Sequence, residues 1–266
     1  MGYLVDPKNW EWITSGSNLR FILEGFLVNL EIALIAMVFA LIFGLLLALA
    51  RLSKSGPVSF VAGAWIDVWR NLPLLFILLG FALALPGSLF QAWERLVGES
   101  VPIAFQSGRI VAALLGLVIY NSAVMAEIMR AGIVSLERGQ GEAAAALGLP
   151  YWKSMRLVIL PQGLRRMVPA TVSQLITLNK DTTLISIVAI REVLKHTKTV
   201  VNANPFLGDF VKAPPLQAYL FVGLLFVIVN LALSRLSRRL EIRQRKVSGT
   251  KVQGITGIED QIAAPA

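Results

Sequence analysis

The side chains that could do chemistry gather at residues 179–183, which read Asn-Lys-Asp-Thr-Thr within a largely apolar part of the chain. A zwitterionic ligand needs both an acceptor and a donor, and Asn179, Asp181 and Thr182 could supply them along a pathway. Adjacent residues of a helix point about 100° apart, so Lys180 and Asp181 need not pair with each other. These four residues form our candidate translocation pathway. A buried network that fixes helix packing is the alternative.

Two acid–base pairs recur at helical spacing in other apolar segments. Asp67 and Arg70 are three residues apart, and so are Glu127 and Arg130. Side chains at this spacing share one face of a helix and can form a salt bridge. Charges inside a membrane segment are costly and usually face a partner. We therefore interpret both as structural ion pairs.

No arrangement of residues in the sequence predicts catalysis. The pattern Gly-x-x-x-x-Gly-Lys-Ser/Thr is absent, so we find no P-loop in this chain. Gly139, Gly141 and Ala144 match a lax dinucleotide fingerprint, but no strand–helix–strand context surrounds them. Glu137 and Glu142 could be taken as a carboxylate pair, but a helix start explains both.

Metal chemistry is equally unsupported by the residue types. The chain has no cysteine and a single histidine, His196, which excludes a thiolate site and a multi-histidine site within one chain. We place His196 in a polar outer loop, where a solvated histidine explains it better than a catalytic triad does. We expect no metal and no enzyme activity.

The elements that position these residues are predicted to be membrane helices. The chain has 266 residues, 56% hydrophobic and 15% charged, whereas a soluble domain is usually about a quarter charged. Residues 32–50 form an uncharged apolar run long enough to cross a hydrocarbon core of roughly 30 Å. We predict an all-α polytopic bundle of about five transmembrane helices. They cover roughly residues 21–50, 58–85, 110–128, 164–190 and 216–234.

Two details refine these spans. Gly44 and Ala48 form a small-xxx-small step suited to close helix packing. Pro73 is expected to kink the second span. The polar residues near the outer end of the first span, which we place at the membrane interface rather than in a vestibule, are Glu24, Asn29 and Glu31.

Basic residues assign the orientation of the bundle. Five spans put the termini on opposite sides, and the positive-inside rule chooses between two models. One side holds fifteen Lys and Arg residues and the other holds eight. We therefore predict an extracytoplasmic segment 1–20, a transmembrane domain 21–240 and a cytoplasmic tail 241–266. The Gly, Ser and Ala content of the tail predicts that it is disordered. The basic tail needs no nucleic acid to explain it.

A short cytoplasmic segment, residues 134–163, separates the third and fourth spans. Residues 142–147 are strong helix formers, with Glu142 in the first turn, where the helix dipole favours an anion. Gly148 is placed as a terminator, and a second short helix, about residues 152–159, can follow until Pro161. A short alanine-rich helix is unstable alone, so we expect it to dock into a partner. A linker helix packed on its own bundle is the alternative.

This segment resembles a known signature. The order Glu142-Ala143-Ala144, Gly148 and Ile-Leu-Pro at 159–161 is similar to the EAA motif in the permease subunits of binding-protein-dependent type I ABC importers. Further stretches resemble the polar amino-acid uptake branch, and the resemblance covers roughly residues 20–240. They are residues 23–33, 69–75, 121–133, 139–149, 158–165 and 178–184. Departures are Asn-Leu at 71–72, where many relatives have Gly-Thr, and a longer outer loop at 86–109.

The resemblance implies a function and a set of partners. In that family the motif forms coupling helices that sit in a groove of a separate ATPase, which here implies an ATPase dimer that binds ATP and Mg²⁺. It further implies a second permease, identical or paralogous, an extracytoplasmic solute-binding protein, an amino-acid substrate and a bacterial inner membrane. The residues that it assigns to ATPase coupling are Glu142, Ala143, Ala144, Gly148 and Pro161. An ion-coupled carrier or channel without an ATPase is the alternative, and a non-transporting membrane scaffold is a third hypothesis.

Overall fold

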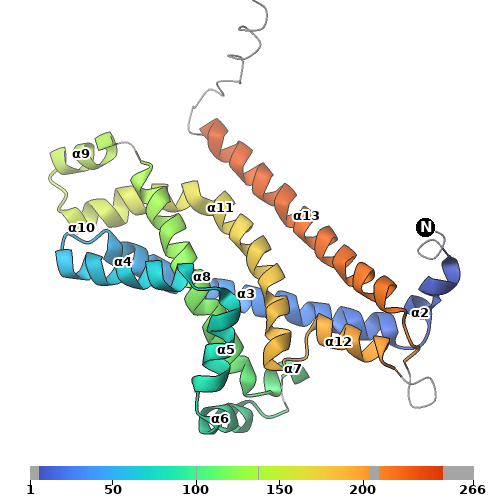
Figure 1. Ribbon diagram of the computed structural model, residues 1–266. Coiled ribbons are helices and arrows are strands. Elements are labelled where there is room, and N and C mark those ends of the chain that lie inside the picture. Colours follow the sequence, from blue (N-terminus) through green and yellow to red (C-terminus); the bar gives the residue numbers. More distant parts are fainter. Residues whose placement is uncertain (1–5, 100, 137, 204–209, 248–266) are drawn as a thin grey trace, which may run out of the picture.

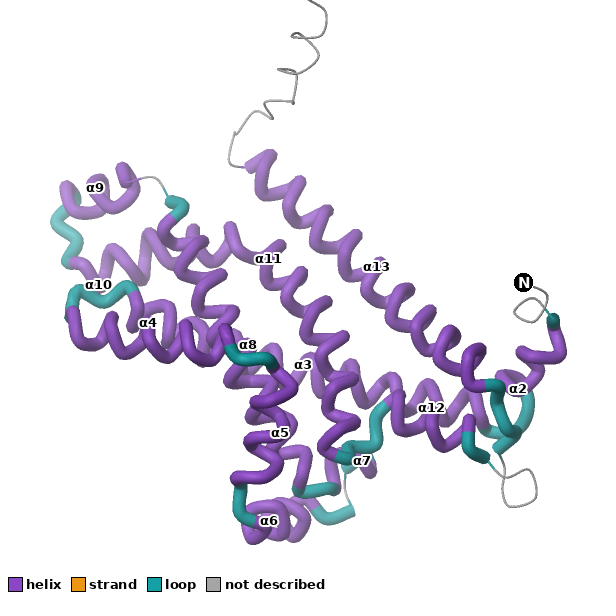
Figure 2. The backbone as a smooth tube through the Cα atoms, viewed as in Figure 1, coloured by secondary structure: helices purple, strands orange, loops and turns teal. Residues whose placement is uncertain are grey.

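The computed structural model describes residues 6–99, 101–136, 138–203 and 210–247, and this part of the chain contains helices and no strand. The predicted all-α class is confirmed. In Figures 1 and 2, α3 runs across the molecule, with α4 beside its C-terminal end and α12 beside its N-terminal end. The elements are η1 (Pro7–Trp10), α2 (Glu11–Thr14), α3 (Asn18–Arg51), α4 (Gly56–Asn71), α5 (Leu74–Ala84), α6 (Gly87–Val97), α7 (Ile103–Gln106), α8 (Arg109–Val134), α9 (Arg138–Ala146), α10 (Tyr151–Ser154), η2 (Met155–Ile159), α11 (Leu160–Asp181), η3 (Thr182–Val188), α12 (Val193–Val201) and α13 (Pro215–Val247).

The centre of the bundle is the crossing of α3 and α8. A stripe of small residues on α3, which includes Ala40, Gly44 and Ala48, is buried there. A Cβ built on Gly44 would lie 2.8 Å from the Cβ of Met125 and 3.1 Å from the backbone nitrogen of Ala126. The glycine thus allows the two helix backbones to approach closely, as the small-xxx-small step predicts.

Apolar helices of sufficient length give the bundle its membrane character. Among the described residues, α3, α8 and α13 are long and apolar enough to cross a membrane, and α4 with α5 adds a fourth if the bent pair is one span. These two helices bend by 101° at the break before Pro73. A proline there cannot continue the hydrogen-bond ladder of α4, so the predicted kink is present as a full break. The count of five spans stays a prediction, because α11 is too polar to qualify.

The prediction that the second short helix ends before Pro161 is wrong. The chain is helical without interruption from α10 through the π-helical turn η2 into α11, and Pro161 lies in the first turn of α11. The amide of Leu160 donates to the carbonyl of Met155, five residues back. A wider π turn accommodates a proline, which lacks an N–H and would clash with the preceding turn of an ordinary helix.

The predicted fourth helix, residues 164–190, also differs from the structure. Its α-helical part ends at Asp181, and the chain continues as the tighter 3₁₀ helix η3 to Val188. Ala189 then takes the left-handed conformation with φ 65°, which ends the helical run.

The prediction of a solvated His196 is wrong. His196 lies in α12, is only 7% exposed, and stacks on the ring of Phe21 at 3.9 Å between ring centres. Its Nδ1 donates to the carbonyl oxygen of Phe21 at 2.6 Å, and a Cβ on Gly25 would touch the imidazole at 2.8 Å. Burial lowers the pKa of His196, so the neutral ring is favoured. The absence of a side chain at Gly25 allows α12 to pack onto α3.

The close crossing of α3 and α8 predicts that a larger side chain at Gly44 will separate the two helices. We expect Gly44→Leu to cost about 1–3 kcal/mol by overpacking and to lower the thermal midpoint of the purified protein in detergent by several degrees. Gly80→Leu on α5 is the matched control, because a Cβ at Gly80 meets no atom within 4 Å. Equal midpoints for the two variants, measured by size-exclusion chromatography after heating, would contradict the role of the crossing.

Candidate coupling segment and translocation face

The segment that carries the predicted coupling residues stands apart from the bundle. In Figure 1, α9 lies at one extremity of the molecule, beside α10. The helix begins at Arg138, so Glu142 belongs to its second turn and not to its first turn as predicted. Gly148 lies just beyond the end of α9 and has φ +74°. The amides of Gly148 and Leu149 donate to the carbonyls of Ala145 and Ala144, which is the Schellman pattern.

The coupling segment turns apolar groups towards the solvent. Glu142 and Ala143 are exposed, whereas Ala144 is 2% exposed and packs on the chain itself. Leu147 and Trp152 are 81% and 68% exposed. Two large apolar side chains presented together on a small helical segment indicate a contact surface for another molecule. Sequence reasoning missed both residues, although each stands within the motif region.

The coupling segment is also tied to the membrane helices. The hydroxyl of Tyr151 donates to the carbonyl of Leu52, at the end of α3, at 3.2 Å. The ammonium group of Lys54 lies 4.7 Å from the centre of the Tyr151 ring, in a cation–π contact. Gln162 of α11 donates to the side chain of Gln140 of α9 at 3.1 Å. A displacement of α9 and α10 therefore reaches both the α3–α4 connection and α11.

The four candidate pathway residues divide into two pairs. Asn179 and Thr182 are buried, and the Asn179 amide donates to Asn230 of α13 at 3.1 Å. Lys180 is exposed and Asp181 is half-buried. The packing interpretation thus describes Asn179 and Thr182, while the two charged neighbours remain open to a ligand or a partner.

Each of the two predicted acid–base pairs is in contact within its own helix. Arg130 donates to both carboxylate oxygens of Glu127 at 3.0 and 3.1 Å through Nε. Asp67 and Arg70 approach to 3.6 Å at the end of α4, with side chains 62% and 39% exposed.

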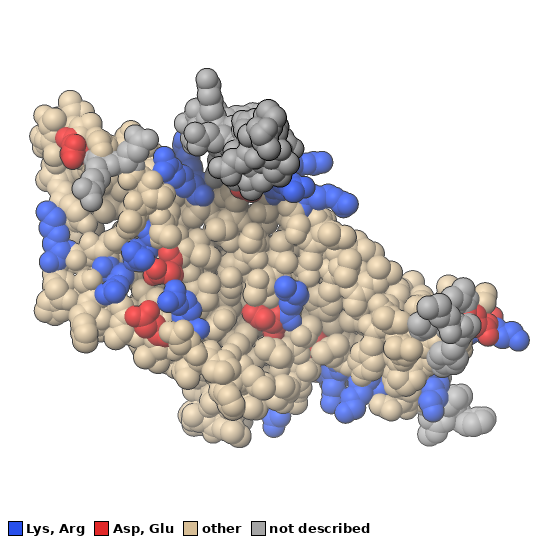
Figure 3. Space-filling model, turned by 45° about the horizontal axis from the view of Figure 1, so that its top comes forward, with Lys and Arg blue, Asp and Glu red and all other residues tan. Residues whose placement is uncertain are grey.

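In Figure 3 acidic and basic side chains lie beside one another at several places on the face that is shown. Arg70 of α4 also interacts electrostatically with Glu127, and Asp181 interacts with Tyr120, which lies seven residues before Glu127 on α8. We call the two ion pairs together with Lys180 and Asp181 the polar face.

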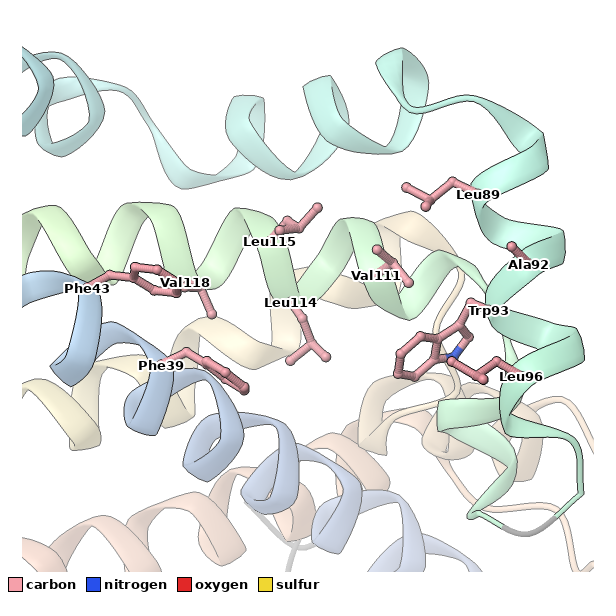
Figure 4. A pocket seen from close by; sticks show the side chains of 10 residues that line it. All are labelled: Phe39, Phe43, Leu89, Ala92, Trp93, Leu96, Val111, Leu114, Leu115 and Val118. Carbon is pink, nitrogen blue, oxygen red and sulfur yellow. The ribbon is translucent and has the colours of Figure 1, made fainter.

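An apolar hollow of the described chain lies elsewhere. Figure 4 shows a groove between α3, α6 and α8, of about 460 Å³, lined by apolar side chains that include Phe39, Trp93 and Leu114. The indole nitrogen of Trp93 already donates to the carbonyl of Phe105 at 2.8 Å. With no free polar group along it, the groove suits hydrocarbon and not a polar ligand.

Two buried polar residues escaped the sequence analysis. Asn29, which we placed at the interface, is fully buried and contacts Thr182 and Glu192. Glu192, at the start of α12, is also fully buried. Asn29, between the apolar Val28 and Leu30, gave a local signal, whereas Glu192 follows Arg191 and gave none. Nothing in the sequence relates positions separated by more than 150 residues. Glu137 lies outside the described residues.

Comparisons with known proteins agree with the geometry. The model of the family described as binding-protein-dependent transport system inner membrane component matches residues 40–246. Similar proteins include the glutamate/aspartate import permease protein GltK of Escherichia coli O6:H1, 32% identical over 88% of this chain and 98% of that protein. The probable glutamine ABC transporter permease protein GlnP of Bacillus subtilis is 35% identical over 86% of this chain and 96% of its own length.

Solved structures give the same agreement at the level of the fold. A crystal structure described as an amino acid ABC transporter with histidines is 27% identical, has a TM-score of 0.65, and is matched over 85% of this chain and 94% of its own chain. An inward-facing MetNI methionine ABC transporter has a TM-score of 0.59 at 17% identity, over 84% of this chain and 97% of its own, which is a likeness of fold alone.

Proposed function

The chain belongs to the family of binding-protein-dependent transport system inner membrane components, and we propose that it moves polar amino acids into the cytoplasm as one permease of an ATP-driven importer. The observation that carries the proposal is the exposed coupling segment. Its Glu-Ala-Ala sequence, its glycine terminator and its exposed Leu147 and Trp152 suit a helix that is seated in a partner.

That partner is a dimer of ATPase subunits, which bind ATP and Mg²⁺. The permease contributes the coupling residues Glu142, Ala143, Ala144 and Gly148, and it performs no hydrolysis itself. Pro161 lies in the first turn of α11, in the helical run that follows these residues. Because α9 and α10 contact the α3–α4 connection and α11, closure of the ATPase dimer moves these membrane helices together.

The chain spans the bacterial inner membrane several times, with the N-terminus outside and the C-terminus in the cytoplasm. This orientation puts the coupling segment and the arginine-rich end of α13 on the side that holds more basic residues. The end of the tail, residues 248–266, lies outside the described residues. An extracytoplasmic solute-binding protein delivers the substrate to the opposite side.

A second permease, a copy of this chain or a paralogue, covers the polar face. In a single chain Asp67 and Arg70 are exposed and Glu127 and Arg130 are half-buried, and charge in a membrane is tolerated where it faces a bundle interior or a wet cavity. The cavity between two such faces is the translocation pathway. Lys180 and Asp181 supply it with a cation and an anion, which together match the carboxylate and ammonium groups of an amino acid.

The substrate class follows from the relatives. GltK is named as a glutamate/aspartate permease and GlnP as a probable glutamine permease, and a third relative, ArtQ of Bacillus subtilis, is named as an arginine permease. Their substrates differ in charge but share the zwitterionic backbone. We therefore propose a polar amino acid and leave its side chain to experiment.

Co-purification and uptake together test the proposal. The chain is purified gently from its native membranes, and the proteins that accompany it are identified by mass spectrometry. We expect an ATPase subunit and uptake of ¹⁴C-labelled amino acids by vesicles that hold the recovered complex, the binding protein and internal ATP. Purification of the chain alone, with uptake driven by an ion gradient, would support the carrier alternative.

The coupling segment predicts that Glu142→Lys uncouples hydrolysis from transport. Reversing a charge at an interface contact costs about 2 kcal/mol or more when the residue is a hot spot, so uptake should fall roughly 30-fold while the chain stays in the membrane. Glu24→Lys is the matched control. Glu24 is an exposed glutamate near the start of α3, far along the chain from the coupling segment, where it pairs with Arg20. Normal uptake by Glu142→Lys would exclude this contact.

The polar face predicts that Asp181→Ala reduces uptake about tenfold or more, because a charge-assisted contact to the substrate ammonium is lost. Binding of the ATPase, measured by co-purification, should be unchanged. Asp181→Asn keeps the volume and removes only the charge. A variant that no longer accumulates in the membrane would favour the packing role of this residue instead.

A further inference from the structure

Asn29 is the meeting point of three elements that are far apart in the sequence. Its side-chain amide donates to the hydroxyl of Thr182 at 3.0 Å and to the carboxylate of Glu192 at 3.2 Å. Its side-chain oxygen accepts from the backbone amide of Val193 at 3.0 Å. Both donors of Asn29 and its acceptor are therefore in use, with α3, the α11–η3 junction and α12 joined at one side chain.

Glu192 holds the second half of this network. Its two carboxylate oxygens accept from the backbone amides of Leu194 and Lys195 at 3.0 Å each, so it caps the N-terminus of α12 as well as binding Asn29. Within the described part of the chain, no Lys, Arg or His nitrogen lies within 4.0 Å of this buried carboxylate. The burial of a carboxylate is costly unless its hydrogen bonds are fixed, so any change at Asn29 leaves that charge poorly compensated.

The network ends beside the polar face. Thr182 directly follows Asp181, and its hydroxyl donates to the carbonyl of Asn179 at 2.7 Å. At this residue the α-helical part of the run gives way to the 3₁₀ helix η3. The direction in which Lys180 and Asp181 point therefore depends on how the junction is anchored to α3.

We propose that Asn29 and Glu192 are positioning residues for transport, which fix α12 and the α11–η3 junction to α3 and so hold Lys180 and Asp181 in place on the polar face. This inference rests on the proposed function. It assigns neither Asn29 nor Glu192 a contact with the substrate. Because α12 lies on the outer side in our orientation, the same bonds connect that surface with the charged residues of the pathway.

A comparison of two buried asparagines tests the proposal. Asn29→Ala and Asn18→Ala remove side chains of the same type from α3, and both are fully buried. Among the described residues, Asn18 bonds the carbonyls of Trp12 and Val211 alone, so it fastens the outer end of α3 without reaching Thr182. In the complete importer with its binding protein, we expect uptake of a ¹⁴C-labelled amino-acid mixture to fall about tenfold in Asn29→Ala and less than twofold in Asn18→Ala. If the two variants lose uptake equally and have equal thermal midpoints, Asn29 has only a structural role and the proposal is overturned.

An exchange of amide and carboxylate tests whether the bond itself matters. Asn29→Asp places two carboxylates at a 3.2 Å contact, and Glu192→Gln removes an acceptor, so each should reduce uptake. The double variant Asn29→Asp with Glu192→Gln again pairs one amide with one carboxylate at nearly the same volume. It loses the acceptor for the backbone amide of Leu194, so the recovery should be partial. We expect it to recover uptake at least threefold over Asn29→Asp. A double variant no better than the worse single variant would contradict the proposal.

A cysteine probe separates this inference from the proposed function. The chain has no cysteine, so Lys180→Cys introduces a single thiol on the polar face. If Asn29 positions the junction, adding Asn29→Ala should change the rate of maleimide labelling at position 180 at least threefold, whereas adding Asn18→Ala should not. This result needs no transport activity. An unchanged labelling rate would reject the positioning role even where uptake confirms the importer, and uptake absent from the wild-type chain would reject the importer while leaving the labelling result to stand.

Discussion

The cost of placing polar groups in hydrocarbon is the constraint on which the rest of this structure depends. Backbone groups satisfy it by forming helices. Side chains satisfy it by segregation, with apolar residues of α3 and α13 exposed to lipid, and with Asn29, Asn179 and Thr182 bonded inside the bundle. Two ion pairs, Asp67 with Arg70 and Glu127 with Arg130, lie on the polar face. In the importer that we propose, a second subunit covers that face.

The helical run from Tyr151 to Val188 connects the candidate coupling segment with the candidate pathway residues. It begins in the coupling segment as α10, continues through η2 and α11, and passes Lys180 and Asp181 before it ends in η3. A continuous helical run transmits displacement better than helices joined by loops, and Pro169 removes one backbone donor within α11 without ending the helix. The π turn η2 is what allows this continuity across Pro161. A single proline that seemed to divide the segment is accommodated within the element that joins it to the pathway.

How much the sequence could predict depended on whether the signal was local. Gly148 as a terminator, the break at Pro73 and the small step at Gly44 are local properties, and all three appear in the structure. The roles of Asn29 and His196 were missed because each depends on a residue far along the chain, Glu192 and Phe21 respectively. Exposure of Leu147 was also out of reach, since an apolar residue in a helix is ordinarily buried.

The two ends of the helical run 151–188 are held by different kinds of contact. At the coupling segment the polar contacts include a hydrogen bond from Tyr151, a cation–π contact with Lys54 and a bond between Gln140 and Gln162. Further along, the exposed Arg166 donates to the carbonyl of Ser135, and Gly163 packs closely on Ile133 of α8. At the outer end, Thr182 is fixed by buried bonds to Asn29, which is itself bonded to Glu192. Buried hydrogen bonds are costly to break, whereas exposed contacts exchange readily with water. In the importer that we propose, a push from an ATPase therefore acts on the more exposed contacts of the cytoplasmic end, while the buried bonds to Asn29 hold the outer end of the run.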